Sequence, residues 1–312
     1  MEFLSNNFIS DFFVIVLKWV FSWVNEYSVA IIIVTIAIRL LILPLDLKQK
    51  KSSRKMALVQ PKLESLKKRY SNNPQQMQKK QKELYAQEGV KPLAGCLPML
   101  ITLPLFFAFF GAMRVLAAEQ QVWFILNAQS IGEGAFQLPS WLWVNNFWMP
   151  DSGLSEILPT GQKFAEFVQT NAAYISPQSM HMLRETGLIN FDPTAGLQAT
   201  AAYDTLAANI INANGVTGVK NGWFILPILA GGSLFLQQKI SMKQNPSMQK
   251  QGKMMLYIFP LFSVYICVTA NAAFSVYWLA ANVYALGQLL VLNFIYKKHD
   301  QRAKEGIVTE GS

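Results

Sequence analysis

Side chains that commonly carry out chemistry are few and scattered in this sequence. The two cysteines, Cys96 and Cys267, lie far apart in apolar stretches, so they form neither a disulfide framework nor a CxxC metal site. The two histidines, His181 and His299, lie in a polar segment and a charged tail, which argues against a His-based triad or a zinc site. We therefore expect no metal, no cofactor and no catalytic residue.

One charged residue nevertheless stands in an unusual place. Arg39 interrupts the apolar stretch TIAIRLLILPLD at 35–46, and a charge at the centre of a membrane helix costs roughly 2.5–3.5 kcal/mol. The apolar stretches of the chain hold no acidic partner for it, and Asp46 follows only near the end of this stretch. Because an unpaired cation in a dry helix bundle is very unfavourable, we expect a hydrated cavity that opens to the cytoplasm.

Other polar residues in the apolar stretches could line such a cavity. Each of them alone favours a hydrogen bond between packed helices, whereas together with an unpaired arginine they favour a hydrophilic pocket. These residues are Thr35, Thr102, Gln237, Gln238, Ser263, Ser275, Asn282 and Gln288.

The elements that would position Arg39 follow from the composition. Of the 312 residues, 52% are hydrophobic and only 14% are charged, whereas about a quarter are charged in soluble domains. A bilayer is crossed by roughly 20 apolar residues. The sequence predicts five spans, with a tight hairpin between the last two: Val29–Leu45, Cys96–Leu116, Trp223–Gln238, Met254–Ala270 and Ala273–Ile295.

The distribution of the net charge of +9 predicts the orientation of these spans. The segments 48–92 and 239–253 are rich in Lys and Arg, whereas 118–221 is acidic. Cytoplasmic loops carry the excess of Lys and Arg, so we expect the N-terminus outside and the C-terminus in the cytoplasm. The excess of Lys and Arg therefore reflects membrane topology, and we expect no direct binding of nucleic acid. These basic segments would also attract anionic lipid.

Two segments next to the spans are expected to be helical. Residues 1–27 repeat large apolar residues at helical spacing and predict an amphipathic helix in the outer interface, with an extra span as the alternative. Residues 48–95 predict a basic cytoplasmic helical hairpin. Pro61 predicts a kink or restart in its first helix, and Asn73-Pro74 begins the second. The apolar seam of the first helix is Met56, Val59, Leu63, Leu66 and Tyr70.

Five stretches resemble the YidC–Oxa–Alb family of membrane protein insertases. They are TIAIRLLILPL, MALVQPKLESLKKRY, VKPLAGCLPMLITLPLFFAFF, FILPILAGGSLFLQQKIS and SVYWLAANVYALGQ, which cover about 28–117 and 222–297 in the family order. The resemblance implies an all-α membrane protein in which five transmembrane helices surround a cytosol-open hydrophilic groove, with a cytoplasmic helical hairpin. It also implies a multi-pass protein of the bacterial cytoplasmic (inner) membrane.

The same resemblance assigns roles to individual residues. It implies that Arg39 is the groove arginine and that Trp278 stands where the family has an aromatic residue facing the groove. Thr35 and Gln237 match groove-lining positions, and Thr102 stands where some relatives have glutamine. With two neighbours of Trp278 added, the candidate substrate-groove residues are Arg39, Thr35, Thr102, Gln237, Trp278, Tyr277 and Asn282.

The chain is therefore expected to divide into consecutive segments. Residues 153–219 lie where relatives usually enter the third span, and they form an insertion whose composition indicates no chemistry. The segments are an N-terminal interfacial helix at 1–27, the first span at 28–47, the hairpin at 48–95, the second span at 96–117, an extracytoplasmic segment at 118–221, the third to fifth spans at 222–297 and a cytoplasmic tail at 298–312.

These observations favour a non-enzymatic insertase and chaperone that receives client segments in a groove and releases their spans into the bilayer. The expected partners are nascent membrane proteins, with the ribosome, the signal recognition particle pathway and the Sec translocon as further candidates. The alternative is a secondary transporter in which Arg39 binds an anionic solute. Such transporters usually show repeated halves, which this sequence lacks. A membrane enzyme would need clustered acid–base groups that the spans lack.

Overall fold

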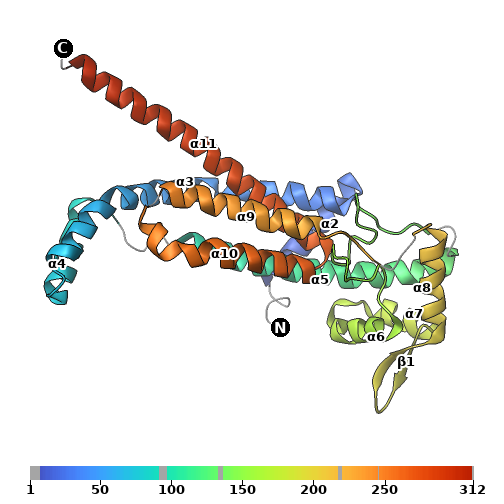
Figure 1. Cartoon of the computed structure of the whole chain (residues 1–312). Coiled ribbons are helices and arrows are strands. Elements are labelled where there is room, and N and C mark those ends of the chain that lie inside the picture. The colour runs from blue at the N-terminus through green and yellow to red at the C-terminus, as the bar shows by residue number, and fades with distance from the viewer. Residues whose placement is uncertain (1–7, 91–96, 133–135, 217–219, 245, 311–312) are drawn as a thin grey trace. The chain divides into compact units, whose positions relative to one another are not determined.

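The computed structural model describes residues 8–90, 97–132, 136–216, 220–244 and 246–310, without the side chains of 97–102, 131, 244, 246–255 and 299–310. The described residues are mostly helical (Figure 1), which confirms the helical content expected from the sequence. The elements are α2 (Phe8–Val24), α3 (Tyr27–Arg69), α4 (Pro74–Gln87), α5 (Leu97–Ile131), α6 (Gly161–Thr170), the 3-10 turn η3 (Ala172–Tyr174), α7 (Pro177–Glu185), β1 (Ile189–Asp192), β2 (Gly196–Ala199), α8 (Ala201–Ala213), α9 (Ile225–Gln244), α10 (Pro246–Thr269) and α11 (Ala272–Glu310).

The chain forms two compact units. Unit 1 consists of Met1–Val34, Leu105–Ala230 and Ser263–Leu279, and unit 2 consists of Thr35–Pro104, Gly231–Phe262 and Ala280–Ser312. The long helices α3, α5, α9, α10 and α11 each contribute residues to both units.

Three helices among the described residues are long and apolar enough to cross a membrane. The stretches lie in α3, in α5 over Leu103–Ser130 and in α11 over Ala272–Lys298, and α10 adds a shorter apolar stretch, Leu256–Thr269. These helices contain the first, second and fifth spans expected from the sequence. The third and fourth spans stay predictions.

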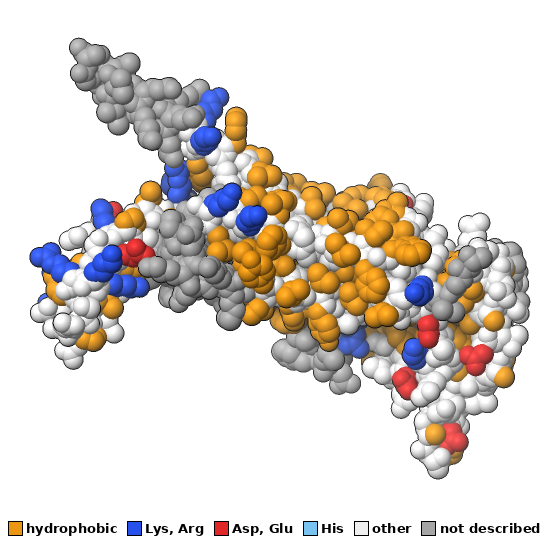
Figure 2. Space-filling model, in the orientation of Figure 1, with side chains coloured by type: hydrophobic (Ala, Val, Ile, Leu, Met, Phe, Trp, Pro, Cys, Tyr) orange, Lys and Arg blue, Asp and Glu red, His pale blue; other side chains and the backbone are white. Residues whose placement is uncertain are grey.

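In unit 2, α3 and α4 form a helical pair. The helix α3 continues through Pro61, so the restart expected there does not occur. Val59 and Leu63 of the predicted seam pack with Leu84 of α4 and with Val90. Several Lys and Arg side chains lie on the face of this pair that Figure 2 shows. The helix α4 begins where the sequence predicts, because the Asn73 side chain accepts a hydrogen bond from the Gln76 backbone N–H at 3.1 Å.

In unit 1, α2 packs along α5. The Phe13 and Phe109 ring centroids are 4.4 Å apart, and the Lys18 ammonium pairs with Glu119 at 2.6 Å. Glu119 lies inside α5, which continues beyond the expected end of the second span at 117. The other face of α2 exposes large apolar side chains: Phe12, Ile15, Trp19 and Trp23. These exposed side chains form the apolar face expected for this helix, and its place in the outer interface stays a prediction.

The segment after α5 is a folded part of unit 1 with its own hydrophobic core. Buried residues of α5, α6, α7 and α8 meet in one cluster, in which the Phe164 and Tyr203 rings stack at 4.3 Å. The buried Tyr203 hydroxyl donates to the Pro159 carbonyl at 2.9 Å, and burial raises the pKa of this phenol well above its usual value. The insertion at 153–219 therefore stabilises itself by burying apolar surface against α5.

A short β-hairpin is the one departure from the all-α expectation among the described residues. Its strands β1 and β2 pair antiparallel, with Ile189 opposite Ala199. The turn forms because the Asp192 carboxylate accepts hydrogen bonds from the hydroxyl and backbone N–H of Thr194 and from the Ala195 backbone N–H, which also lower the pKa of Asp192. Short polar turns of this kind compete well with helix, and here the turn precedes a glycine at positive φ, Gly196.

A buried carboxylate fixes the beginning of α9. Asp151 is fully buried and accepts hydrogen bonds from the Trp143 indole N–H at 3.0 Å, from the Trp223 backbone N–H at 2.8 Å and from the Leu226 backbone N–H at 2.7 Å. Glycine is required at 222, because a Cβ there would collide with this carboxylate. Asp151 thus caps a helix N-terminus, where a negative charge is favourable.

We predict that Asp151→Ala lowers the free energy of unfolding by roughly 2–3 kcal/mol, because one buried and two partly buried donors lose their acceptor. Thermal unfolding of the detergent-solubilised protein measures the loss. Asp192→Ala is the matched control, since this exposed turn carboxylate should cost well under half as much. Equal losses in the two variants would contradict the capping role.

Candidate functional site

The structure distributes the predicted groove residues over both units. Unit 2 holds Thr35, Arg39, Gln237 and Asn282. Unit 1 holds Tyr277 and Trp278. The helix α5 contains Thr102, but the side chain of Thr102 is outside the described residues.

Arg39 begins a stripe of charged residues on α3 in unit 2. At about 100° per residue, Arg39, Asp46, Lys50 and Arg54 lie within about 80° of one another around the helix axis. Arg39 is half-buried, and Asp46 is close enough to interact electrostatically with both Arg39 and Lys50. Across the described side chains, the ion pairs form elsewhere and no carboxylate is within salt-bridge distance of Arg39. The arginine therefore has an acidic neighbour along the helix but no direct ionic partner among those side chains.

The lower part of this stripe contacts α11. The Lys50 ammonium donates a hydrogen bond to the Gln288 side-chain oxygen at 3.1 Å, and the Arg54 guanidinium lies 4.3 Å from the centre of the Tyr296 ring. A cation over an aromatic face is attracted by the ring quadrupole. Residue numbers increase in the same direction along both helices, so α3 and α11 run parallel in unit 2.

Two buried side-chain amides in unit 2 have a nitrogen without a hydrogen-bond partner among the described residues. Gln49 is 7% exposed, and its side-chain Nε2 and that of Gln288 have no hydrogen-bond partner among the described residues. An unsatisfied buried donor costs about 1–3 kcal/mol, so native proteins usually supply water or another acceptor. Gln49 is absent from the sequence-based set, because it follows the apolar run and was counted with the basic hairpin.

The aromatic residues of the candidate set lie in unit 1. The Trp278 indole N–H donates to the Ser263 hydroxyl at 2.6 Å, and its ring meets Phe106 at a centroid distance of 5.0 Å. Tyr277 is buried and stacks on Phe109 at 4.0 Å. Trp278 is thus held by neighbours in a defined orientation, and Tyr277 contributes to packing.

Two serines of the expected cavity lining form hydrogen bonds that connect the last two helices. The Ser275 hydroxyl donates to the Cys267 backbone carbonyl at 3.2 Å, and Ser263 accepts from Trp278. Asn271 begins α11 by accepting a hydrogen bond from the Phe274 backbone N–H. These contacts make α10 and α11 an antiparallel hairpin with the tight turn that the sequence predicts.

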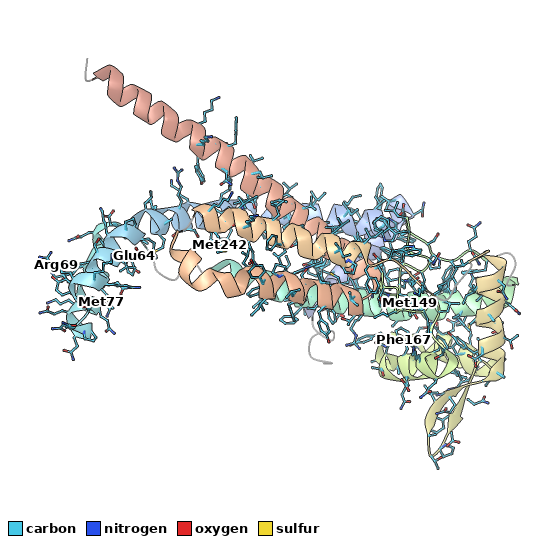
Figure 3. The ribbon with its side chains drawn as sticks, in the orientation of Figure 1. Glu64, Arg69, Met77, Met149, Phe167 and Met242 are labelled. Atoms are coloured by element: carbon cyan, nitrogen blue, oxygen red, sulfur yellow. The ribbon has the colours of Figure 1, made fainter. Side chains whose placement is uncertain are left out.

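Each unit also contains a cavity that Arg39 does not line. In unit 2, a cavity of about 450 Å³ lies between α3 and α4, and half of its lining residues are charged, including Lys62, Arg69 and Glu83. In unit 1, a cavity of about 390 Å³ is lined mostly by apolar side chains, and Met149 and Phe167 mark it in Figure 3. Its polar side includes Arg114, which donates to Asn171 at 3.2 Å. Within the described side chains, no three His, Cys, Asp or Glu residues come together as metal ligands.

Apolar helices of membrane-crossing length define an integral membrane protein. Residues 19–300 match the family described as 60Kd inner membrane protein, and the chain belongs to that family.

Three relatives illustrate the similarity. The chain is 29% identical over 287 residues to membrane protein insertase MisCA of Bacillus subtilis, covering 90% of this chain and 76% of that protein. It is 27% identical over 309 residues to membrane protein insertase YidC 2 of Listeria innocua, covering 96% and 77%. It is 28% identical over 292 residues to membrane protein insertase YidC of Fusobacterium nucleatum, covering 94% and 97%. These matches confirm the resemblance expected from the five stretches.

We predict that the Trp278–Ser263 hydrogen bond couples α10 and α11 measurably. Trp278→Phe and Ser263→Ala should each destabilise the protein, and the double variant should lose less than the sum by about 1 kcal/mol. A double-mutant cycle of unfolding in detergent measures this coupling. As a control, Trp223→Phe combined with Ser263→Ala should be additive, because Trp223 is exposed. Additivity for Trp278 as well would show that the contact contributes nothing.

Proposed function

We propose that this chain is a membrane protein insertase. The observation that carries the proposal is the match over nearly its whole length to proteins named membrane protein insertases. The structure supports it through a long apolar helix with a half-buried arginine that lacks an ionic partner among the described side chains.

The proposed architecture has five membrane-crossing helices, α3, α5, α9, α10 and α11. Because successive helices cross the bilayer in opposite directions, the first and fifth helices should run parallel and the fourth and fifth antiparallel. The contacts of α11 with α3 in unit 2 and with α10 in unit 1 have these directions. The basic α3–α4 pair would lie in the cytoplasm and the folded segment at 118–221 outside, as the distribution of Lys and Arg requires.

In the proposed mechanism, a hydrophilic groove receives the polar outer segment of a client from the cytoplasm. Arg39 attracts an acidic segment, since charges interact more strongly where the surroundings are less polar than water. Asp46 on the same face weakens the attraction and limits the residence of the segment. Thr35, Thr102, Gln237 and Asn282 line the groove, with Trp278 and Tyr277 as its aromatic residues.

The client's apolar span would then leave sideways into lipid. Exposed apolar side chains on α9 and α11 provide a suitable surface for it: Ile228, Leu229, Leu236, Val283, Leu290, Val291, Phe294 and Ile295. Burial of the span in lipid drives the release. A groove inside one leaflet shortens the hydrocarbon layer that polar residues of the client must cross. Local thinning of the bilayer would shorten this path further.

The α3–α4 pair would receive clients and their delivery factors. Its charged cavity and basic exterior suit the acidic surfaces of the ribosome, the signal recognition particle pathway or the Sec translocon, as well as anionic lipid. Nascent membrane proteins are the proposed clients.

We predict that Arg39→Ala lowers membrane insertion of a single-span client with an acidic outer segment by roughly tenfold, because the attracting charge is lost. Arg39→Lys should keep most of the activity, since the charge remains. Insertion is measured by protease protection in proteoliposomes that contain the purified full-length chain. Arg114→Ala is the control, because this arginine pairs with Asn171 in unit 1. Wild-type insertion by Arg39→Ala would disprove the attraction step.

We also predict that water reaches position 39 from the cytoplasmic side. In a variant with both native cysteines replaced, Arg39→Cys should react with a membrane-impermeant maleimide added to inside-out vesicles, and not to right-side-out vesicles. Ile31→Cys in the same background should stay unlabelled, because Ile31 is fully buried. Labelling of position 39 from the outer side alone would overturn the proposed orientation.

A further inference from the structure

Three loops of unit 1 meet at the buried carboxylate of Asp151. It accepts hydrogen bonds from the Trp143 indole N–H at 3.0 Å and from the Trp223 backbone N–H at 2.8 Å. The buried Asn221 side chain also joins two of these loops, because it accepts from the Asn146 backbone N–H at 2.7 Å and donates to the Asn146 carbonyl at 2.9 Å. These hydrogen bonds hold together the loops 141–146, 150–154 and 221–224.

Each of the three loops presents a large apolar side chain at its surface. Leu142 is 73% exposed, Leu154 is 86% exposed and Trp223 is 72% exposed. Gly153 places the loop of Leu154 against the Phe224 ring, since a Cβ at residue 153 would come within 2.9 Å of that ring. Single exposed apolar residues are ordinary, whereas three on adjoining hydrogen-bonded loops form a patch. We name Leu142, Leu154 and Trp223 the apolar corner.

The backbone at Leu142 has a conformation that leucine rarely adopts. Its φ is 51°, in the left-handed region, and the tight turn around it is closed by two hydrogen bonds of 2.8 Å between Trp141 and Val144. A residue other than glycine is strained in this region, and Leu142 is too exposed for burial within the chain to offset the strain. We therefore expect the compensating contact of this side chain to lie outside the chain.

The apolar corner adjoins the beginning of α9. Trp223 lies two residues before Ile225, the first residue of α9, and Asp151 caps this end of the helix. Within unit 1, the first turns of α9 also expose Ile228 and Leu229. The exposed apolar surface thus continues along the chain from Trp223 into α9. Tryptophan is enriched where a membrane span meets the headgroup layer, because its ring is apolar and its N–H is polar.

We propose that the apolar corner inserts into the outer leaflet of the bilayer and fixes the level at which α9 enters it. This inference rests on the proposed function, in which α9 crosses the membrane and the segment at 118–221 lies outside. The boundary between headgroups and acyl chains accepts apolar side chains without a charged partner, and the three side chains carry no charge. Because hydrogen bonds already order the three loops, insertion costs little further conformational entropy.

The experiment uses the full-length protein in proteoliposomes of zwitterionic phospholipid. In a variant with both native cysteines replaced, Leu142→Cys and Leu154→Cys each carry an environment-sensitive fluorophore. Quenching is measured with phospholipids brominated on the upper acyl chain and, separately, with aqueous iodide. We expect the brominated lipid to quench both labels severalfold more strongly than a label on Phe191→Cys. Phe191 is the matched control, because it is an exposed apolar residue of unit 1 that belongs to β1 and not to these loops.

Two results with these labels would overturn the proposal. Quenching of positions 142 and 154 by iodide, with no more quenching by brominated lipid than at position 191, would place the apolar corner in water. Protection of both positions from both quenchers would assign the apolar corner to a contact with a second copy of the chain.

A label on Ile228→Cys separates this proposal from the proposed function. If brominated lipid does not quench the label at 228, α9 does not cross the membrane as proposed, and the proposed architecture fails together with this inference. If it quenches the label at 228 but not those at 142 and 154, only the insertion of the apolar corner is overturned.

The level of α9 is tested by combining Leu142→Asn with Leu154→Asn. Asparagine is polar and tolerates the left-handed region, so the turn is kept while the apolar corner loses two of its members. We expect the label at 228 to move toward the outer aqueous phase, with less quenching by lipid brominated deep in the acyl chain and more by lipid brominated near the headgroup. Phe191→Asn should leave this ratio unchanged. An unchanged ratio in the paired variant would overturn the role of the apolar corner in fixing the level of α9.

Discussion

The cost of placing polar groups in an apolar layer governs this protein. A charge or an unpaired amide inside a membrane bundle is retained only where water, another side chain or a ligand compensates it. Arg39, Gln49 and Gln288 are such groups in unit 2, and each is only partly compensated by its described neighbours. The polar groups of unit 1 differ, because Asp151, Ser263, Ser275 and Trp278 all have hydrogen-bond partners. Among these residues, the polar groups that lack a hydrogen-bond or ionic partner in the described structure therefore lie in unit 2, whereas those of unit 1 all have one.

This contrast indicates that the two units differ in role, with stable packing in unit 1 and polar, charged groups in unit 2. Unit 1 contains stacked aromatic rings, capped helices and a folded segment packed on α5. All of these favour a single native conformation. Unit 2 contains the charged stripe of α3, the unpartnered amides and the basic helical pair, where charge and hydration dominate. Functional sites commonly break the rules that stable cores obey, and the stability lost there is recovered elsewhere in the fold.

Much of the helical framework could be predicted from the sequence, because long apolar runs, Asn73-Pro74 and Asn271 are local signals. The family resemblance was confirmed for the same reason, since its motifs lie in these runs. Three features could not be predicted. Continuation of α3 through Pro61 and of α5 beyond 117 depends on tertiary packing, which overrides local propensity. The partners of Ser263 and Ser275 depend on the register of two helices. The burial of Gln49 without a partner for its nitrogen among the described residues is visible only once α3 is packed in the fold, and the groove roles of the other residues stay predictions.

The folded segment after α5 has a mechanical consequence. The last turns of α5, from Ala118 to Ala128, contribute side chains to the same core as α6, α7 and α8. Tilting or sliding α5 relative to these helices would pull several fully buried residues out of that core at once, which costs several kcal/mol. The segment therefore acts as a brace that holds this end of α5 rigid. Any conformational change during function must then involve helices that do not pack against this folded segment.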